Sequence, residues 1–334
     1  MTDAAALSAD QQRPAEPGVL DDVPGWFWDQ DRHLFDWFLG RQEKAGRSGD
    51  LMEMGAYLGR SAIVIGSHLQ PGESFTVCDL FDSDAPDDEN AAEMDMSYRR
   101  TLTRAAFETN YLAFNERLPE IVQAPTSTLG GGRVAPGAFR FIHIDASHLY
   151  EHVAEDIQVA RTALASDGVV VLDDYRSAHT PGVAAATWEA VFNHGLRPIV
   201  LTDSKFYGTW GDPEPAQLDL LARRGTLPHC DISSETVDGR RLVRISGSDA
   251  GAEPFRVSRH HARLAAEAER RAAEQVADDA FRAAERDRET ADRDLADRRA
   301  RAAERRRPAN VAKRAVGDLL PPVVTSAIRR ARRG

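Results

Sequence analysis

The sequence predicts an α/β fold: a Rossmann-like, mostly parallel seven-stranded sheet that ends in an antiparallel hairpin, followed by a long C-terminal helix. From Asp50 onward, short apolar runs alternate with helical patterns, which is typical of βαβ units with right-handed crossovers. Only Asp203 and Ser204 separate the apolar runs 198–202 and 205–210, a spacing that favours a hairpin at the end of the sheet. Beyond about residue 255, Ala, Arg, Glu and Asp dominate without Gly or Pro until Pro308, which predicts one long helix.

Seven apolar runs are predicted to form the strands of the sheet, and a helical pattern precedes the fifth of them. That helix is the clearest in the sequence, because Val153, Ile157, Ala160 and Leu164 recur at helical spacing on one face. The predicted strands are residues 51–54, 75–78, 121–124, 139–144, 169–172, 198–201 and 205–210. A further hairpin around Asp238-Gly239 has no assigned place in this sheet.

The chain divides into four segments by composition. Residues 1–22, rich in Ala, Pro, Asp and Gln, are interpreted as a disordered leader, and residues 23–250 as the folded α/β domain. Its first helical stretch carries Trp26, Trp28 and Trp37, which we expect to pack on the rest of the domain. Residues 255–307 form the long charged helix, for which a coiled coil and a solvated single helix remain alternatives. Residues 308–334 form a basic amphipathic tail.

Charge and cysteine content exclude several classes of protein. The net charge is −11, yet residues 301–334 hold ten Lys or Arg against two Asp or Glu, so an acidic body precedes a basic tail. We therefore expect no specific nucleic-acid partner. The tail predicts a weak contact with an acidic membrane surface or protein, and a homo-oligomer is left open. Two cysteines exclude a disulfide framework, and without a signal-like N-terminus or an apolar run of membrane length we expect a cytoplasmic protein.

A glycine-containing turn follows the first strand. In Glu53-Met-Gly55-Ala-Tyr57-Leu-Gly59 the glycines permit a tight turn and a close approach to a ligand, and the next helix presents free N–H groups. Dinucleotide-binding enzymes have a similar turn with the pattern Gly-x-Gly-x-x-Gly, but the second glycine of that pattern would fall on Tyr57 in this sequence. The second strand ends at Asp79, where a carboxylate can accept the hydroxyls of a ribose. The alternative for Asp79 is an ordinary solvated strand end.

Three aspartates follow two neighbouring strands. Asp145 ends the fourth strand, and Asp173-Asp174 end the fifth. The carboxyl ends of parallel strands meet at one edge of a sheet, so these carboxylates should lie together. Clustered carboxylates repel one another unless a cation joins them, and oxygen ligands favour Mg²⁺ or Mn²⁺ over zinc. The alternative is that Asp145 and Asp174 cap helices while Asp173 is solvated.

Residues 25–211 resemble class I S-adenosylmethionine-dependent O-methyltransferases. The segment 53–62, EMGAYLGRSA, resembles the cofactor loop of catechol O-methyltransferases; IHIDASHLYE at 142–151 and GVVVLDDY at 168–175 are similar to the macrocin O-methyltransferase-like family. The resemblance implies an S-adenosylmethionine cofactor and Mg²⁺ or Mn²⁺. It implies cofactor roles for Glu53, Gly55, Ala56, Tyr57, Gly59, Ser61, Asp79 and Ser127, and metal roles for Asp145, Asp173 and Asp174.

The sequence departs from these relatives at the catalytic base. Catechol enzymes place a lysine three residues after the first metal aspartate, where this chain has His148, and some sugar-methylating relatives place an aspartate where it has Ser147. A neutral histidine can accept a hydroxyl proton, so we predict that His148 is the base, while mid-strand His143 is structural. The predicted acceptor is a hydroxyl of a sugar, glycan or other small natural product. The alternatives are a hydroxylase-like relative of the same fold and an adaptor that acts through the long helix and tail.

Overall fold

The computed structural model describes residues 16–97, 101–227, 229–247, 251, 253–319, 324, 326, 327 and 331. The chain separates into two compact units, Met1–Ala262 and Arg263–Gly334, and each is described by itself. Residues 1–15 of the predicted leader lie outside the described part of the chain. The last part of that leader is folded, because Leu20–Asp22 form a 3₁₀ helix and Leu20 is buried.

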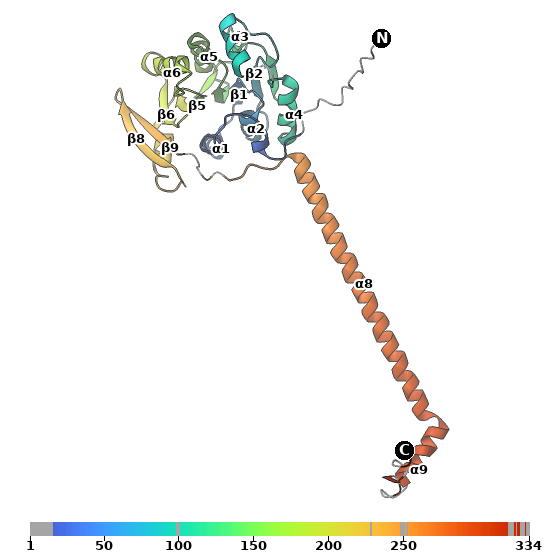
Figure 1. Cartoon of the computed structure of the whole chain (residues 1–334). Helices are drawn as coiled ribbons and strands as arrows, with labels where there is room; N and C mark the ends of the chain where they lie inside the picture. Colours follow the sequence, from blue (N-terminus) through green and yellow to red (C-terminus); the bar gives the residue numbers. More distant parts are fainter. Residues whose placement is uncertain are drawn as a thin grey trace, which may run out of the picture. The chain divides into compact units, whose positions relative to one another are not determined.

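The first unit is built on one sheet with the strand order β3-β2-β1-β4-β5-β7-β6-β9-β8 (Figure 1). Strands β1 to β5 are parallel, and β7 pairs antiparallel with both β5 and β6. The predicted α/β fold and its antiparallel hairpin are therefore confirmed. The strands are β1 Asp50–Met54, β2 Phe75–Asp79, β3 Glu120–Gln123, β4 Phe139–Ile144, β5 Leu164–Leu172, β6 Arg197–Leu201 and β7 Phe206–Thr209.

Two further strands extend the predicted seven to nine among the described residues. β8 Asp231–Val237 and β9 Arg240–Ser246 form an antiparallel hairpin, and β9 pairs parallel with β6. Asp238 and Gly239 at its turn both have positive φ, as a two-residue hairpin turn requires. The hairpin at Asp238-Gly239 thus belongs to the main sheet. β5 is longer than predicted, since it includes Asp167 and Gly168.

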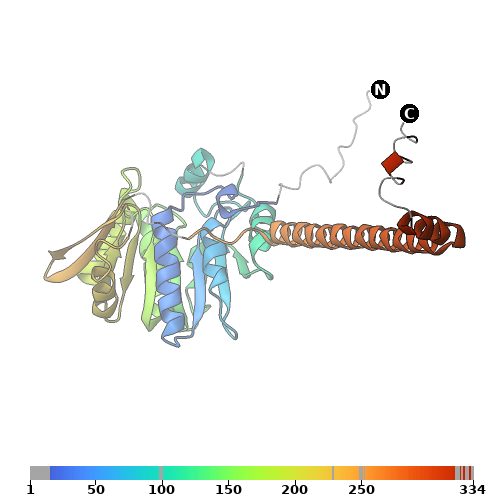
Figure 2. The ribbon, with the colours of Figure 1, turned by 90° about the horizontal axis from the view of Figure 1, so that it is seen from below.

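Helices cover both faces of the sheet. One core cluster unites residues of α1 Asp29–Lys44, α2 Arg60–Ser67 and α4 Arg104–Phe114 with the sheet, and a second unites residues of α5 Tyr150–Ala163 and α6 Pro181–Asn193 with it. Figure 2 shows α1, in blue, lying against the strands. The remaining helices of this unit are α3 Asp88–Ser97 and α7 Glu214–Leu221. Side chains of β1 to β5 are thus held from two sides, which fixes the positions of their carboxyl ends.

The long helix α8 spans Arg259–Arg306, and α9, Pro308–Leu319, follows it. α8 has no buried residue, and its larger apolar side chains Leu264, Val276, Phe281 and Leu295 are exposed. Ion pairs one helical turn apart, such as Arg270 with Glu274, support its surface. A search of the described residues finds no helix with the length and apolar character to span a bilayer.

Candidate active site

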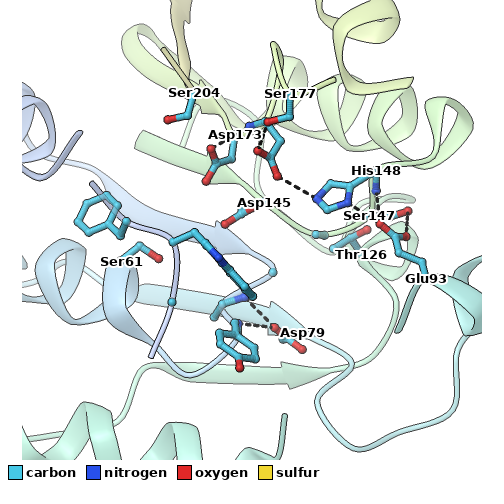
Figure 3. Close-up of a pocket in the computed structure, with 18 of the residues that line it drawn as sticks. Ser61, Asp79, Glu93, Thr126, Asp145, Ser147, His148, Asp173, Ser177 and Ser204 are labelled. Atoms are coloured by element: carbon cyan, nitrogen blue, oxygen red, sulfur yellow. Dashed lines mark hydrogen bonds and ion pairs between the residues drawn. The ribbon is translucent and has the colours of Figure 1, made fainter. Parts of the chain in front are cut away.

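A cavity of about 1110 Å³ lies at the carboxyl ends of β1, β2, β4 and β5 (Figure 3). It brings together most of the residues singled out from the sequence, although they lie as far apart as positions 55 and 174. The predicted residues that line it are Gly55, Ala56, Tyr57, Ser61, Asp79, Ser127, Asp145, His148, Asp173 and Asp174. Glu53 and Gly59 do not line it.

The turn after β1 depends on Gly55. Its φ is +77°, and a Cβ added there would lie 2.1 Å from the backbone oxygen of Asp145. The Gly55 amide also donates to the carbonyl of Cys78 at 2.8 Å, so the turn packs directly on its neighbouring strands. Gly59 caps α2 with φ +93°, and a Cβ there would meet the ring of Phe107 at 3.0 Å. Both glycines therefore shape the loop that faces the cavity.

Asp79 holds this loop in place. One carboxylate oxygen accepts from the amides of Ala56 at 2.7 Å and Tyr57 at 3.0 Å, and the other accepts from Phe81 at 2.6 Å. Burial raises the pKa of Asp79, while these three backbone donors oppose that shift. An ionised carboxylate offers roughly four lone-pair sites, so about one remains for a ligand in the cavity.

Glu53 lies beneath the cavity. It is fully buried, and its Oε1 contacts Nδ1 of His143 at 2.7 Å, while Oε2 has no hydrogen-bond partner among the described residues. Burial raises the pKa of Glu53 to about 8 and lowers the pKa of His143 well below its ordinary value. Both residues are thus fully buried, and neither lines the cavity.

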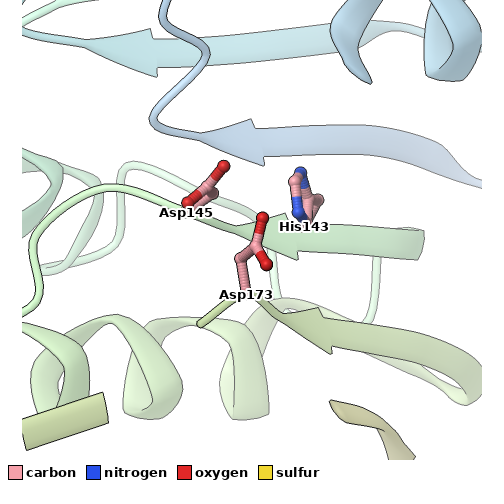
Figure 4. A group of neighbouring side chains, drawn as sticks. All are labelled: His143, Asp145 and Asp173. Atoms are coloured by element: carbon pink, nitrogen blue, oxygen red, sulfur yellow. The ribbon is translucent and has the colours of Figure 1, made fainter. Parts of the chain in front are cut away.

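The three predicted metal aspartates lie close together but do not form one cluster. Ligand atoms within 4.8 Å of one another form two groups that share Asp145: one with His143 and Asp173, the other with His148 and Asp174. Figure 4 shows the first group at the ends of β4 and β5. Asp174 has φ +53°, an unfavourable backbone conformation for a non-glycine residue. Its Oδ1 accepts from the Ser177 hydroxyl at 2.6 Å.

His148 lies between two carboxylates (Figure 3). Its Nδ1 lies 2.6 Å from Oε1 of Glu93, and its Nε2 lies 3.3 Å from Oδ2 of Asp174. Burial lowers the pKa of His148, but Asp174 and Glu93 outweigh it and raise the pKa to about 10. The same contact lowers the pKa of Asp174 to about 2 against the effect of burial. The predicted base is therefore an imidazolium near neutral pH in this arrangement.

The site residues predicted from the sequence fall within a segment that matches a known family. Residues 52–175 match the family described as "Methyltransferase domain". This segment is a methyltransferase domain. The methyltransferase recognised from the sequence motifs is thereby confirmed. The match covers little more than a third of the chain, and it contains every predicted site residue from Glu53 to Asp174.

Solved structures similar to this chain include several O-methyltransferases. "O-methyltransferase NovP" is 17% identical at a TM-score of 0.43, covering 54% of this chain and 79% of its own. CalS11, described as a TDP-rhamnose 3'-O-methyltransferase of calicheamicin biosynthesis, is 18% identical at 0.37, with 55% and 80% covered. TomG from Streptomyces achromogenes is 16% identical at 0.38, with 57% and 83% covered. No curated protein matches. Because these TM-scores are below 0.5, the assignment rests on the family match.

Lys205, which the sequence analysis did not single out, lies outside the matched methyltransferase domain yet reaches its acidic cluster. It lies just before β7, is 1% exposed, and its Nζ pairs with Oδ2 of Asp173. Burial opposes its charge, but Asp173, Asp145 and Asp31 together raise the pKa of Lys205. A lysine at the start of the apolar run 205–210 was the only signal in the sequence, and nothing local shows which residues it faces.

The first helical segment also contributes to the site, contrary to expectation. Phe27, on this segment, is buried, but Trp26 is 62% and Trp28 is 56% exposed, and all three line the cavity. Trp26 and Trp28 precede α1 and line the cavity instead of lying in the core, although the Trp26 ring packs on Tyr57 with 5.6 Å between the ring centroids. Glu93 on α3 also contributes, and in the sequence it is one of many acids between Asp82 and Asp95, with nothing local to distinguish it.

The acidic cluster fits a divalent cation in part. Asp145 accepts no side-chain hydrogen bond in the described structure, and with Asp174 it offers oxygen atoms of the kind that Mg²⁺ and Mn²⁺ prefer. Asp173 fits less well, since Oδ1 accepts from the Asp174 amide at 2.8 Å and Oδ2 is paired with Lys205. Asp145 is thus the member of the predicted triad best suited to hold a metal, and Asp174 can join it when His148 releases Oδ2.

Proposed function

We propose that this chain transfers a methyl group from S-adenosylmethionine to a hydroxyl of a sugar or natural-product acceptor. One observation carries the proposal: a single cavity of about 1110 Å³ joins the Gly55–Tyr57 loop and Asp79 to Asp145, His148 and Asp174. The loop side suits a nucleoside with a charged amino-acid portion, and the acidic side suits a hydroxyl that must lose its proton.

On the cofactor side, Asp79 would accept a hydrogen bond from one ribose hydroxyl, because three backbone amides already occupy its other sites. Gly55, Ala56 and Tyr57 would border the cofactor, and Ser61 lies at the start of α2 beneath it. Ser127, in the 3₁₀ helix Thr126–Leu129 after β3, lines the same cavity at the position proposed for the adenine. Glu53 and Gly59 would support this loop without touching the cofactor.

On the acceptor side, Asp145 and Asp174 would hold Mg²⁺ or Mn²⁺, with Asp173 behind them. When bound, such an ion lowers the pKa of an acceptor hydroxyl and orients it. The acceptor oxygen would attack the methyl carbon of S-adenosylmethionine as the carbon–sulfur bond breaks, leaving S-adenosylhomocysteine. The hydroxyl proton would go to Nε2 of His148, which must first be neutral and free of Asp174. The exposed rings of Trp26 and Trp28 would cover an apolar face of the acceptor.

The test is transfer of a labelled methyl group from S-adenosylmethionine into an extract of the native organism, followed by identification of the labelled product. We expect labelling of a hydroxyl, and loss of labelling with His148→Ala. If the wild-type chain labels nothing in the extract, a hydroxylase-like reaction or an adaptor role is favoured.

We also propose that the basic tail makes a weak, salt-sensitive contact with an acidic surface. Vesicle co-sedimentation of the full-length and the truncated protein would test this contact.

A further inference from the structure

Lys205 places a buried cation against the acidic cluster. It reaches the cluster because β7 pairs between β5 and β6, so the residue before β7 lies beside the end of β5. There its Nζ pairs with Asp173 and lies 3.5 Å from Nε2 of His143 and 5.7 Å from the ring centroid of Phe27. An ammonium that is 1% exposed stays charged only if carboxylates surround it.

The three aspartates differ in what already binds them. Asp173 is 8% exposed, and both of its oxygens accept hydrogen bonds, from Lys205 and from the Asp174 amide. Asp174 is bound by Ser177 and His148, which are both on the cavity side. Asp145 accepts no side-chain hydrogen bond within the described residues. A divalent ion could therefore reach Asp145 from the cavity, and Asp174 once His148 releases its Oδ2, whereas at Asp173 it meets a buried ammonium.

We propose that the ammonium of Lys205 occupies the position that a divalent cation would need in order to contact Asp173. The cluster would then bind such a cation weakly, and only through Asp145 and Asp174. The inference rests on the cation role proposed above for this cluster. It assigns Lys205 as the residue that sets the metal affinity. Asp173 then serves as the ion-pair partner of Lys205 and not as a metal ligand.

Electrostatics sets the direction of the effect. A divalent ion beside Asp145 would be repelled by the nearby ammonium in a site largely withdrawn from water, where charges interact more strongly than in bulk solvent. Removing the ammonium also frees an oxygen of Asp173 for coordination. Both changes favour metal binding, so the uncharged variant Lys205→Met should bind Mn²⁺ on the order of tenfold more tightly.

Mn²⁺ binding, measured by electron paramagnetic resonance on the full chain, tests the proposal without any acceptor. We expect Lys205→Met to raise the affinity at least about tenfold, and Lys44→Met, which alters an exposed lysine at the end of α1, to leave it unchanged. An affinity of Lys205→Met equal to or below that of the wild type, or binding by neither protein, would overturn the proposal.

A second comparison does not need Lys205 to be changed. In the wild-type background, Asp145→Asn should weaken Mn²⁺ binding much more than Asp173→Asn, which removes a charge but no ligand; equal losses would contradict the inference even if Lys205→Met does not fold. Methyl transfer is assayed separately. A chain that transfers methyl groups but whose Mn²⁺ affinity is unchanged by Lys205→Met refutes this inference alone. A chain that transfers none refutes the proposed function and leaves the binding result standing.

Discussion

Glu93 holds His148 at two points: its Oε1 accepts from the backbone amide of His148 at 3.1 Å and lies 2.6 Å from ring Nδ1. The carboxylate on α3 thus fixes the ring so that Nε2 faces Asp174 and the cavity. Such a carboxylate partner also favours the protonated ring. Glu93 therefore has two opposing effects on a histidine base, since it orients the ring and raises the pKa of His148.

These effects can be separated by two variants. Glu93→Gln removes the charge and keeps a hydrogen-bonding side chain, so the pKa of His148 should fall and the acidic limb of the pH–rate profile should move to lower pH. Glu93→Ala also removes the ring's partner, and kcat should fall. His148→Ala should lower kcat by about 10²–10⁴, the contribution of a general base, while cofactor affinity persists. A profile that is the same in Glu93→Gln and wild type would show that His148 does not titrate in the reaction.

Asp79 should be needed for cofactor affinity. Asp79→Ala removes the carboxylate that binds the amides of Ala56 and Tyr57 and faces the cavity. A hydrogen bond to a charged group contributes about 1.5–3 kcal/mol, so affinity for S-adenosylmethionine should fall at least about tenfold by calorimetry. Asp84→Ala, at an exposed acid nearby, is the matched control. Equal affinities of the two variants would remove Asp79 from the cofactor site.

The parts of the site that the sequence predicted are those set by local order along the chain. Gly55 and Asp145 directly follow strands and Asp79 is the last residue of one, and parallel strands bring their carboxyl ends together whatever the details of packing. Lys205 could not be placed in the same way. Its position requires β7 to insert between β5 and β6, and nothing near residue 205 encodes that order. The contact of Glu93 with His148 similarly depends on where α3 lies in the fold, because the two residues are 55 positions apart in the sequence.

The fold, like the site, was predicted from the sequence only in part. Alternation of apolar and helical segments identified β1 to β7, but not the addition of β8 and β9 beside β6. That pairing joins residues 200 and 243, and an exposed strand edge does not reveal its partner in the sequence. Trp28 was misplaced for a related reason: a tryptophan is apolar enough for a core, and only the path of the chain leaves it at the rim of the cavity.

Gly55 and Gly72 provide a matched test of the cofactor loop. Both have positive φ, +77° and +89°, so alanine at either position costs about 1–2 kcal/mol of backbone strain. A Cβ at Gly72 meets nothing within 4 Å, whereas at Gly55 it would overlap the backbone of Asp145. We expect Gly72→Ala to lower the free energy of unfolding modestly and keep cofactor binding. Gly55→Ala should lose binding and more stability. Similar behaviour of the two variants would mean that the loop can move away from β4.

Asp156 predicts how stability changes with pH. This residue of α5 is 1% exposed, and neither of its carboxylate oxygens has a hydrogen-bond partner among the described residues. Burial raises the pKa of Asp156 from 3.8 to about 7 in the folded chain. Between these two values the folded state keeps a proton that the unfolded state has lost. The contribution of Asp156 to stability is therefore complete below about pH 4 and is lost as the pH rises to about 7.

Asp156→Asn removes the buried charge and should reverse this loss. At pH 8 the variant should be more stable than the wild type, by about 4 kcal/mol at most if the whole shift is recovered. Near pH 4 the two proteins should unfold alike, because the wild-type carboxyl is then protonated in the folded state. Urea unfolding of both proteins at pH 4 and pH 8 measures the difference, and Asp84→Asn, at an exposed site, controls for the overall change in charge. If the free energies of unfolding of Asp156→Asn and the wild type differ by the same amount at both pH values, the prediction is contradicted. Asp156 would then be ionised within the folded protein and would have a partner, such as a bound water, that stabilises its charge.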